Sequence, residues 1–278
     1  MKKMSKLFAV LLAMLMLCGM LAGCGKQQTE QESQSGQTEQ NALEKVQSAG
    51  KLVIATSPDF PPFEMLGENG EVIGIEIELM QKIAAKLNVA LEITQMDFDS
   101  VLTGVQANKF DCAASGISVD EDRKKNMDFT DPYCLAAQAI VVKADSDIQT
   151  KADLTGKKVA VQSGTTADKF CQNNQYQVSA FTANNDAQAA LLAGKVDAWV
   201  IDDLTAAEMV KAYNAEHPDA LVVLSEAMTT EPYAFAFAKG SDALVSKINE
   251  ALHELLNDGT VKALFEKYEA PYTAPSAE

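Results

Sequence analysis

From Lys51 onward, short apolar segments alternate with amphipathic segments, and this alternation constrains the fold more than any other feature of the chain. The strand candidates are residues 52–55, 90–94, 112–115, 139–142, 158–161 and 198–201. Between the first two, residues 76–87 place Ile77, Met80 and Ile83 on one helical face, together with Ala84 and Leu87. Strands that alternate with helices predict an α/β fold of βαβ units with a largely parallel sheet.

The first 24 residues have the pattern of a secretion signal. Three lysines stand within the first six residues, and an apolar run follows at 7–22, shorter than the ~20 residues of a membrane-spanning helix. The run ends in Leu21-Ala22-Gly23-Cys24, which resembles the lipobox of bacterial lipoproteins. We expect a signal peptide at 1–23 and a lipid on Cys24. The alternative is an ordinary signal peptide with a chance cysteine.

The segment after Cys24 is too polar to bury a core. Residues 25–41 are mostly Gln, Ser, Thr, Glu and Gly, so burial cannot offset their ordering entropy. We expect a flexible tether at 24–45, against the alternative of an ordered arm. No later run is long and apolar enough to span a membrane.

Charge and composition exclude several classes of function. The chain carries 39 acidic and 23 basic residues, a net charge of −16, which argues against nucleic acid and against an anionic membrane surface as partners. His217 and His253 suggest no catalytic triad or metal site. Cys112, Cys134 and Cys171 have no metal spacing, and we expect small buried thiols, although two could pair. No cofactor and no metal are predicted.

Ligands of parallel sheets bind beyond the carboxyl ends of the strands, which directs attention to the residues after 55, 114, 161 and 201. The first of these loops, 56–65, is stiffened by prolines and carries Phe60 and Phe63. We expect Phe63 in the core. For Phe60, the core and a cleft are equally good interpretations.

The second loop, 116–125, offers three groups. Gly116 allows close backbone approach, Ser118 has a hydroxyl, and Arg123 has a planar fork that suits a carboxylate. From spacing alone, the alternative for Arg123, a surface salt bridge with the neighbouring acids Glu121, Asp122 and Asp128, is the stronger one.

The third loop offers groups that suit an anion, and the fourth loop offers one that suits a cation. Residues 162–166, QSGTT, lead into a helix whose free N–H groups suit an anion, although the same residues also serve as N-caps. Asp202 follows the last strand and can hold an ammonium or cap the next helix. Taken together, the four loops offer binding partners for the carboxylate, the ammonium and the side chain of a free α-amino acid.

At this point the chain resembles the extracellular solute-binding proteins of bacterial ABC importers, in the polar amino-acid group. The helix GIEIELMQKIAAKL (74–87) is similar to that family's signature. The other similar segments, in the same order, are 55–64, 96–111, 115–133, 159–166, 194–203 and 234–242. The resemblance covers about 45–270.

The resemblance implies a two-lobed periplasmic-binding-protein fold of type II, with two hinge strands and a ligand cleft between the lobes. Lobe 1 would comprise 46–133 and 234–270, and lobe 2 would comprise 137–230, with a tail at 271–278. The crossing strands would lie near Tyr133–Ala137 and Glu231–Phe235. Ligand contacts would close the hinge.

The resemblance also implies roles for individual residues. Arg123 would grip the α-carboxylate with help from Ser118, Thr165 and Thr166. Gly116 or Ser115 would accept from the α-ammonium through a backbone carbonyl, and Asp202 would pair with its charge. Phe60 and Phe98 would sandwich the ligand side chain, and Gln162 would contact its polar end.

One departure from the family pattern bears on the ligand. Several relatives carry an acid directly after the first strand, where this chain has Ser57, with Asp59 two residues on. The missing acid weakens the case for a basic ligand, so the prediction is a polar or basic L-amino acid.

The resemblance further implies a monomer that captures a free L-amino acid and delivers it to the permease and ATPase subunits of an ABC importer. With the anchor, the protein would lie on the outer face of a cell membrane, in a Gram-positive-type envelope. It would not be an enzyme. Two alternatives stay open: a cyclohexadienyl or arogenate dehydratase of the same fold, with Glu64, Glu231 or Asp59 as a general acid, and a ligand-sensing subunit.

Overall fold

The computed structural model describes residues 41–275. The predicted signal peptide, Cys24 and most of the predicted tether lie outside this range. The last four tether residues, 42–45, belong to a helix, α1 (Ala42–Ala49), whose N-cap is Asn41. Within the described range, no helix combines the length and the apolar character needed to cross a membrane.

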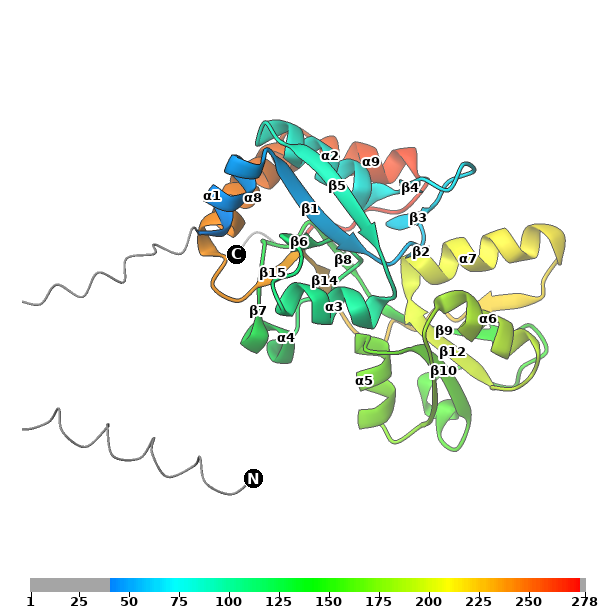
Figure 1. The fold of residues 1–278 in the computed structure, drawn as a ribbon. Coiled ribbons are helices and arrows are strands. Elements are labelled where there is room, and N and C mark those ends of the chain that lie inside the picture. The colour runs from blue at the N-terminus through cyan, green and yellow to red at the C-terminus, as the bar shows by residue number, and fades with distance from the viewer. Residues whose placement is uncertain (1–40, 276–278) are drawn as a thin grey trace, which may run out of the picture. The chain divides into compact units, whose positions relative to one another are not determined.

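Helices and strands alternate through most of the described chain (Figure 1). The other helices are α2 (Ile75–Lys86), α3 (Phe98–Gln106), α4 (Glu121–Asn126), the 3-10 helix η1 (Lys151–Leu154), α5 (Thr166–Asn173), α6 (Asn184–Leu192), α7 (Asp203–Glu216), α8 (Asp242–Asn257) and α9 (Thr260–Lys267). The strands are β1 (Lys51–Thr56), β2 (Asp59–Phe60), β3 (Glu64–Leu66), β4 (Val72–Ile73), β5 (Ala90–Gln95), β6 (Cys112–Ala113), β7 (Met127–Phe129), β8 (Cys134–Ala136), β9 (Gln138–Lys143), β10 (Lys158–Gln162), β11 (Gln177–Phe181), β12 (Ala198–Asp202), β13 (Leu221–Val223), β14 (Glu231–Tyr233) and β15 (Ala236–Ala238).

The first lobe is built on a sheet with the strand order β5-β1-β6-β15-β7. Strand β1 lies inside it, parallel to β5 and β6, and its Leu52 and Ile54 are fully buried. Helix α2 contributes Ile77, Met80 and Ile83 to the same core, as their spacing predicts. Helices α8 and α9 contact α2, and α3 contacts β1, β6 and β15.

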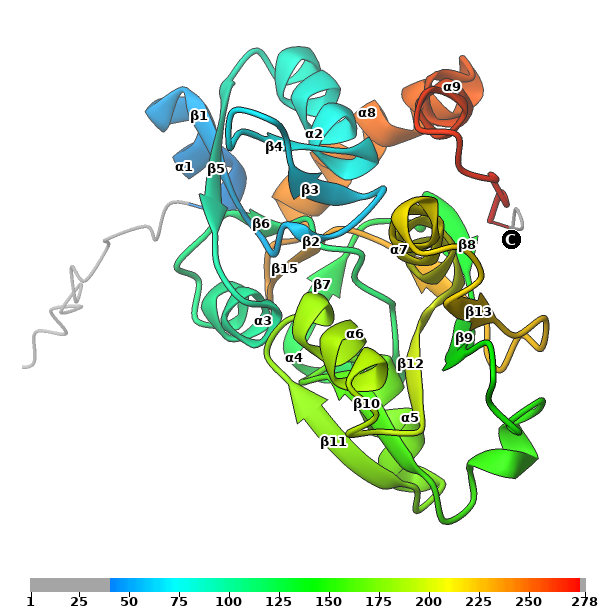
Figure 2. The same ribbon diagram turned by 90° about the vertical axis from the view of Figure 1, so that its right-hand side faces the viewer.

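The second lobe is built on a sheet with the order β11-β10-β12-β9-β13. Helices α6 and α7 form one core against it, around the fully buried Trp199, and α5 forms another with Ala167 and Cys171 (Figure 2). Strands β10 and β12 lie inside the sheet, so the loops that follow them are held on a rigid base.

The expected parallel pairing holds for only three strands of each sheet. The parallel pairs are β1 with β5 and β6, and β10 with β11 and β12. Strands β9 and β15 are antiparallel to all their partners. Both follow directly from another strand without a helical crossover, and parallel pairing needs such a crossover.

Two short antiparallel strands connect the lobes. β8 leads from the first lobe into the second and β14 leads back, with Cys134 opposite Tyr233 and Ala136 opposite Glu231. The predicted two-lobed fold with two connecting strands is therefore confirmed. The residue boundaries assigned to each lobe and to the tail remain predictions.

Candidate ligand-binding site

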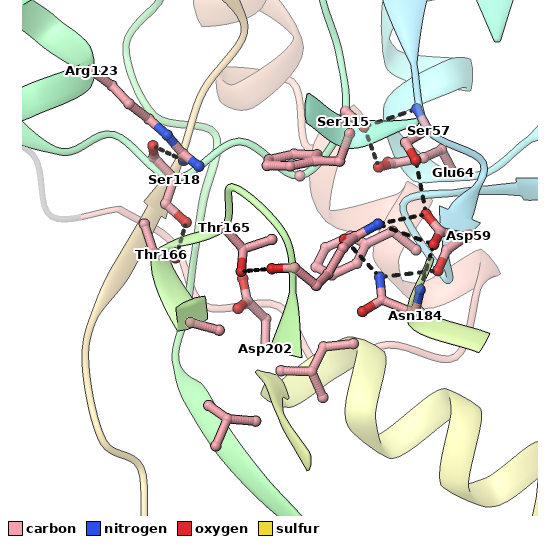
Figure 3. Close-up of a pocket in the computed structure, with 17 residues that line it drawn as sticks. Ser57, Asp59, Glu64, Ser115, Ser118, Arg123, Thr165, Thr166, Asn184 and Asp202 are labelled. Carbon is pink, nitrogen blue, oxygen red and sulfur yellow. Dashed lines mark hydrogen bonds between the residues drawn. The ribbon is translucent and has the colours of Figure 1, made fainter. Parts of the chain in front are cut away.

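A pocket lies where the loops after β1, β6, β10 and β12 meet, with about 410 Å³ of empty space including its opening to solvent (Figure 3). All eleven residues that the sequence predicted as ligand-binding line it: Ser57, Phe60, Phe98, Ser115, Gly116, Ser118, Arg123, Gln162, Thr165, Thr166 and Asp202. The other lining residues are Asp59, Glu64, Ala167, Asn184, Val200 and Ile201. The carboxyl ends of parallel strands share one edge of a sheet, which brings these loops together.

Arg123 is the only arginine of the whole chain, and α4 places it at one end of the pocket. Its side chain is about nine-tenths buried. One guanidinium nitrogen donates to the carbonyl of Ser118 at 2.8 Å and the other to the carbonyl of Gly164 at 3.2 Å. The guanidinium also lies 5.6 Å from the ring centroid of Phe98. Burial lowers the pKa of Arg123, and the charge of Asp120 opposes this effect.

The alternative interpretation of Arg123 is not observed. Glu121, Asp122 and Asp128 pair with lysines instead, and the only ion pair of Arg123 among the described residues is a 3.9 Å contact with Asp120. An ion pair at this distance is weak. The guanidinium therefore faces the pocket without a strong anionic partner.

Asp202 is fully enclosed at the end of β12. Gln138 and the Tyr233 hydroxyl donate to its two oxygens. Its side chain does not cap α7, which was the alternative interpretation. Burial, followed by the nearby charge of Glu231, raises the pKa of Asp202 to about 8. A carboxyl group in this state gains strongly from a cation placed beside it.

Asp59 lies at the other end of the pocket from Arg123, in β2 (Figure 3). Its carboxylate accepts from the Ser57 hydroxyl at 2.9 Å, from Nε2 of Gln162 at 3.1 Å and from the backbone N–H of Asn184 at 2.7 Å. Asn184 also donates from Nδ2 to Oε1 of Gln162 at 2.9 Å. The bonds from Gln162 and Asn184 to Asp59 join the second lobe to the first.

Glu64 is a completely buried carboxyl group beside this end of the pocket. The Ser115 hydroxyl donates to one oxygen at 3.1 Å, and that hydroxyl accepts from the backbone N–H of Ser57 at 3.0 Å. Burial and the neighbouring carboxylate of Glu76 raise the pKa of Glu64 well above its usual range. Both effects favour the protonated form of Glu64.

Gly116 is required by the packing of an aromatic ring. Its φ of +53° lies in the left-handed region, and a Cβ there would lie 2.4 Å from Cε1 of Phe60. The Phe60 ring thus rests directly on the backbone of the second loop. Phe63 is fully buried, as predicted, and Phe60 lines the pocket.

The start of α5 faces the pocket through Thr165 and Thr166. Thr165 caps the helix by accepting from the N–H of Asp168 at 3.1 Å, so the capping interpretation is correct for this residue. Thr166 lies 3.5 Å from the hydroxyl of Ser118, oxygen to oxygen. The N–H groups of the first turn have no partner within the helix, so they suit an anion in the pocket whether or not Thr165 is a cap.

Further bonds join the lobes around the pocket. The Ser163 hydroxyl donates to Asp99 at 2.7 Å, and Lys169 pairs with Asp122. Gly164 allows the first of these contacts, because a Cβ at this position would lie 1.8 Å from Oδ1 of Asp99.

Sequence reasoning missed Asn184, which no motif indicated. The structure shows the signal that was available: Asn184 comes shortly after β11, and β11 is parallel to β10. The same rule that selected four loops would have selected this fifth one, had the strand at 177–181 been predicted.

No group of three or more His, Cys, Asp or Glu side chains within residues 41–275 is arranged to hold a metal ion. Cys112, Cys134 and Cys171 are buried and unpaired, which confirms the expected buried thiols.

The sequence profile of the bacterial extracellular solute-binding proteins, family 3, matches residues 52–271. The chain belongs to this family, and the family predicted from the sequence is confirmed.

Particular relatives share most of this chain. The L-cystine-binding protein TcyJ of Escherichia coli K12 is 32% identical over 234 residues, which are 83% of this chain and 86% of TcyJ. The arginine-bound form of a truncated ArgBP from T. maritima is 40% identical with a TM-score of 0.71, covering 76% of this chain and 99% of that one. An ancestral amino acid-binding protein, AncCDT-1, described as a precursor of cyclohexadienyl dehydratase, is 33% identical with a TM-score of 0.74, covering 82% of this chain and 99% of that one.

Proposed function

We propose that this protein captures a free α-amino acid between its lobes for an ABC importer. The observation that carries the proposal is that one buried arginine, Arg123, and one buried aspartate, Asp202, line the same pocket. An α-amino acid presents a carboxylate and an ammonium on the same carbon, so it supplies a partner for each.

The carboxylate would lie between Arg123 and the first turn of α5. A guanidinium fork binds a carboxylate through two parallel hydrogen bonds, and helix N–H groups add further donors. Arg123 comes from the first lobe and α5 from the second, so one carboxylate contacts both lobes. Contacts made only when the lobes meet shift the hinge equilibrium toward closure.

The ammonium would pair with Asp202. The backbone carbonyl of Ser115 or Gly116 would accept a second hydrogen bond from it. The rings of Phe60 and Phe98 would flank the ligand side chain, and Gln162 would contact its polar end. The ligands named for the relatives, cystine and arginine, have polar or charged side chains, which agrees with a polar or basic amino acid here.

Substitution of Arg123 tests the proposal. Arg123→Ala should weaken amino-acid binding by about 2–5 kcal/mol, because the ligand carboxylate would be buried without its partner. Arg123→Lys keeps the charge but loses the fork, and it should give an intermediate loss. Isothermal titration calorimetry, after a thermal-shift screen of amino acids has found a ligand, measures both.

Unchanged affinity in Arg123→Ala would remove the carboxylate clamp. The same titration also separates binding from catalysis: mass spectrometry of the recovered ligand should find it unchanged. Turnover of prephenate or arogenate would favour the dehydratase alternative, for which the buried Glu64, with its raised pKa, is the best placed acid.

We also propose that Cys24 carries a lipid that keeps the protein on the outer face of the membrane, near its permease. The motif Leu21–Cys24 and the polar residues after it support this, and a monomer on a flexible tether can reach a neighbouring permease. Detergent phase partition of the protein and of Cys24→Ala would test the anchor, which would be excluded if both stayed in the aqueous phase.

A further inference from the structure

The charges around the pocket do not balance when only the α-groups of an amino acid are counted. Arg123 is the only cationic side chain that lines it, and the acidic ones are Asp59, Glu64 and Asp202. The ligand carboxylate compensates Arg123, and the ligand ammonium compensates Asp202. Glu64 is buried beside Glu76, and both effects raise its pKa and so favour its protonated form. One negative charge, on Asp59, remains.

Asp59 has no cationic partner in the described part of the chain, since it takes part in none of the ion pairs found there. Its partners are neutral donors: the Ser57 hydroxyl, the Gln162 amide and the Asn184 N–H. These donors fix the orientation of the carboxylate and leave its charge uncompensated. A carboxylate offers about four acceptor positions. The bonds above take three of them, and the fourth accepts only a 3.5 Å contact from the same Gln162 amide, which a cationic donor can replace.

The part of the pocket between Asp59 and the end that would hold the ligand's α-carboxylate suits a ligand with an extended side chain. Asp59 and Arg123 lie at opposite ends of the pocket (Figure 3). Phe60 follows Asp59 in the chain, and its ring lies against Gly116 in the lining of the pocket. A hydrocarbon stem or a planar cation gains from such a ring face. The hydrocarbon stem of a bound ligand would therefore extend from its α-carbon toward the uncompensated carboxylate of Asp59.

We propose that the pocket selects amino acids with a second nitrogen cation at the far end of the side chain, and that Asp59 binds this cation. This inference rests on the proposed amino-acid binding. The class comprises the guanidino and diamino acids, of which arginine, lysine and ornithine are examples. Cystine also presents a distal ammonium, although the carboxylate beside it leaves that end without net charge. In this proposal Asp59 takes the role of the acid that the sequence lacks at Ser57.

L-Arginine and L-citrulline form a matched pair, because citrulline has nearly the same shape and a neutral ureido group. The wild-type protein should bind arginine at least about tenfold more tightly than citrulline, as expected for a cation that meets an enclosed carboxylate. In Asp59→Asn the preference should fall to about threefold or less, mainly through a loss of arginine affinity. Calorimetry of the purified protein with both ligands gives the four affinities.

The control for a purely structural role of Asp59 is built into this design. If Asp59 serves only to join the lobes, Asp59→Asn weakens both ligands by the same factor and the inference is overturned. Equal wild-type affinity for arginine and citrulline also overturns it. Binding of neutral amino acids without binding of arginine or cystine would reject the second cation and retain the proposed function, whereas binding of no amino acid would reject both.

Cystine tests whether the second cation can be a distal ammonium, as an alternative to the side-chain cation of arginine. Its matched control is the mixed disulfide of cysteine and 3-mercaptopropionate, which lacks the distal ammonium. A strong preference for cystine that is lost in Asp59→Asn supports the inference with the distal ammonium as the source. No preference for cystine over its control, together with none for arginine over citrulline, contradicts it.

Discussion

Single residues of the pocket are held in states that a ligand would change. Asp202 is the clearest case, because its carboxyl group is enclosed and its pKa is about 8 before any cation arrives. Arg123 is similar in kind, since it is buried, its guanidinium donates to the backbone carbonyls of Ser118 and Gly164, and its ion pair with Asp120 spans 3.9 Å. Both groups carry a cost in the empty pocket that an α-amino acid relieves.

Binding should release a proton from Asp202. At pH 7 this carboxyl group is mostly protonated, and an ammonium beside it lowers its pKa, so up to one proton leaves per ligand bound. Affinity should therefore rise by as much as about tenfold per pH unit below pH 8 and then level off. Calorimetry at pH 7 in buffers of different ionisation enthalpy measures the protons released.

The control is Asp202→Asn, which cannot release this proton and should bind more weakly. A binding enthalpy that does not depend on the buffer in the wild-type protein would contradict the role of Asp202. Full proton release that persists in Asp202→Asn would assign the proton to another group, for which the buried Glu64 is the candidate.

Loops at strand ends bring the pocket together, and how closely they approach depends on glycines. Gly164 has a φ of +75° and leaves room for Asp99 across the contact between the lobes. Gly156 of the same lobe has a φ of +79°, and a Cβ added there would meet no atom within 4 Å. Substitution of each glycine by alanine therefore distinguishes the effect of backbone conformation on stability from the effect of contact between the lobes on binding.

Gly164→Ala should weaken ligand binding by up to about tenfold, roughly 1.4 kcal/mol, because the new methyl group displaces the Asp99 side chain and breaks its bond to Ser163 between the lobes. Gly156→Ala should cost about as much stability of the ligand-free protein, since the φ penalty is shared, and leave affinity unchanged. Thermal denaturation and calorimetry on both variants measure the two effects. Equal affinity in Gly164→Ala and Gly156→Ala would show that this contact between the lobes does not limit binding.

Sequence patterns predicted the elements well where the signal was local. The helix of Ile77, Met80 and Ile83 and the buried β1 follow from periodicity, and the rule for strand ends selected four of the loops that line the pocket. The antiparallel direction of β9 and β15 was not predicted, because it depends on how the connecting strands enter each sheet. Asn184 was missed because its strand, β11, was not predicted.

At the scale of the whole molecule, the pocket exists only where the two lobes meet. Spacing alone favoured a surface ion pair for Arg123, since nothing local in the sequence shows that Gly164, 41 residues away in the second lobe, accepts from its guanidinium. The family resemblance supplied that tertiary information. It left the ligand's side-chain class open between polar and basic, and our proposal assigns that choice to Asp59 in this particular chain.

The central claim is that a free amino acid places its carboxylate against Arg123. Because Arg123 is the only arginine in the chain, protein labelled with [15N]arginine gives a single guanidinium Nε–H signal in an NMR spectrum. We predict that titration with the amino acid found by calorimetry shifts this signal progressively and saturates at one equivalent. An unchanged signal at a ligand concentration that calorimetry shows to be saturating would contradict the account.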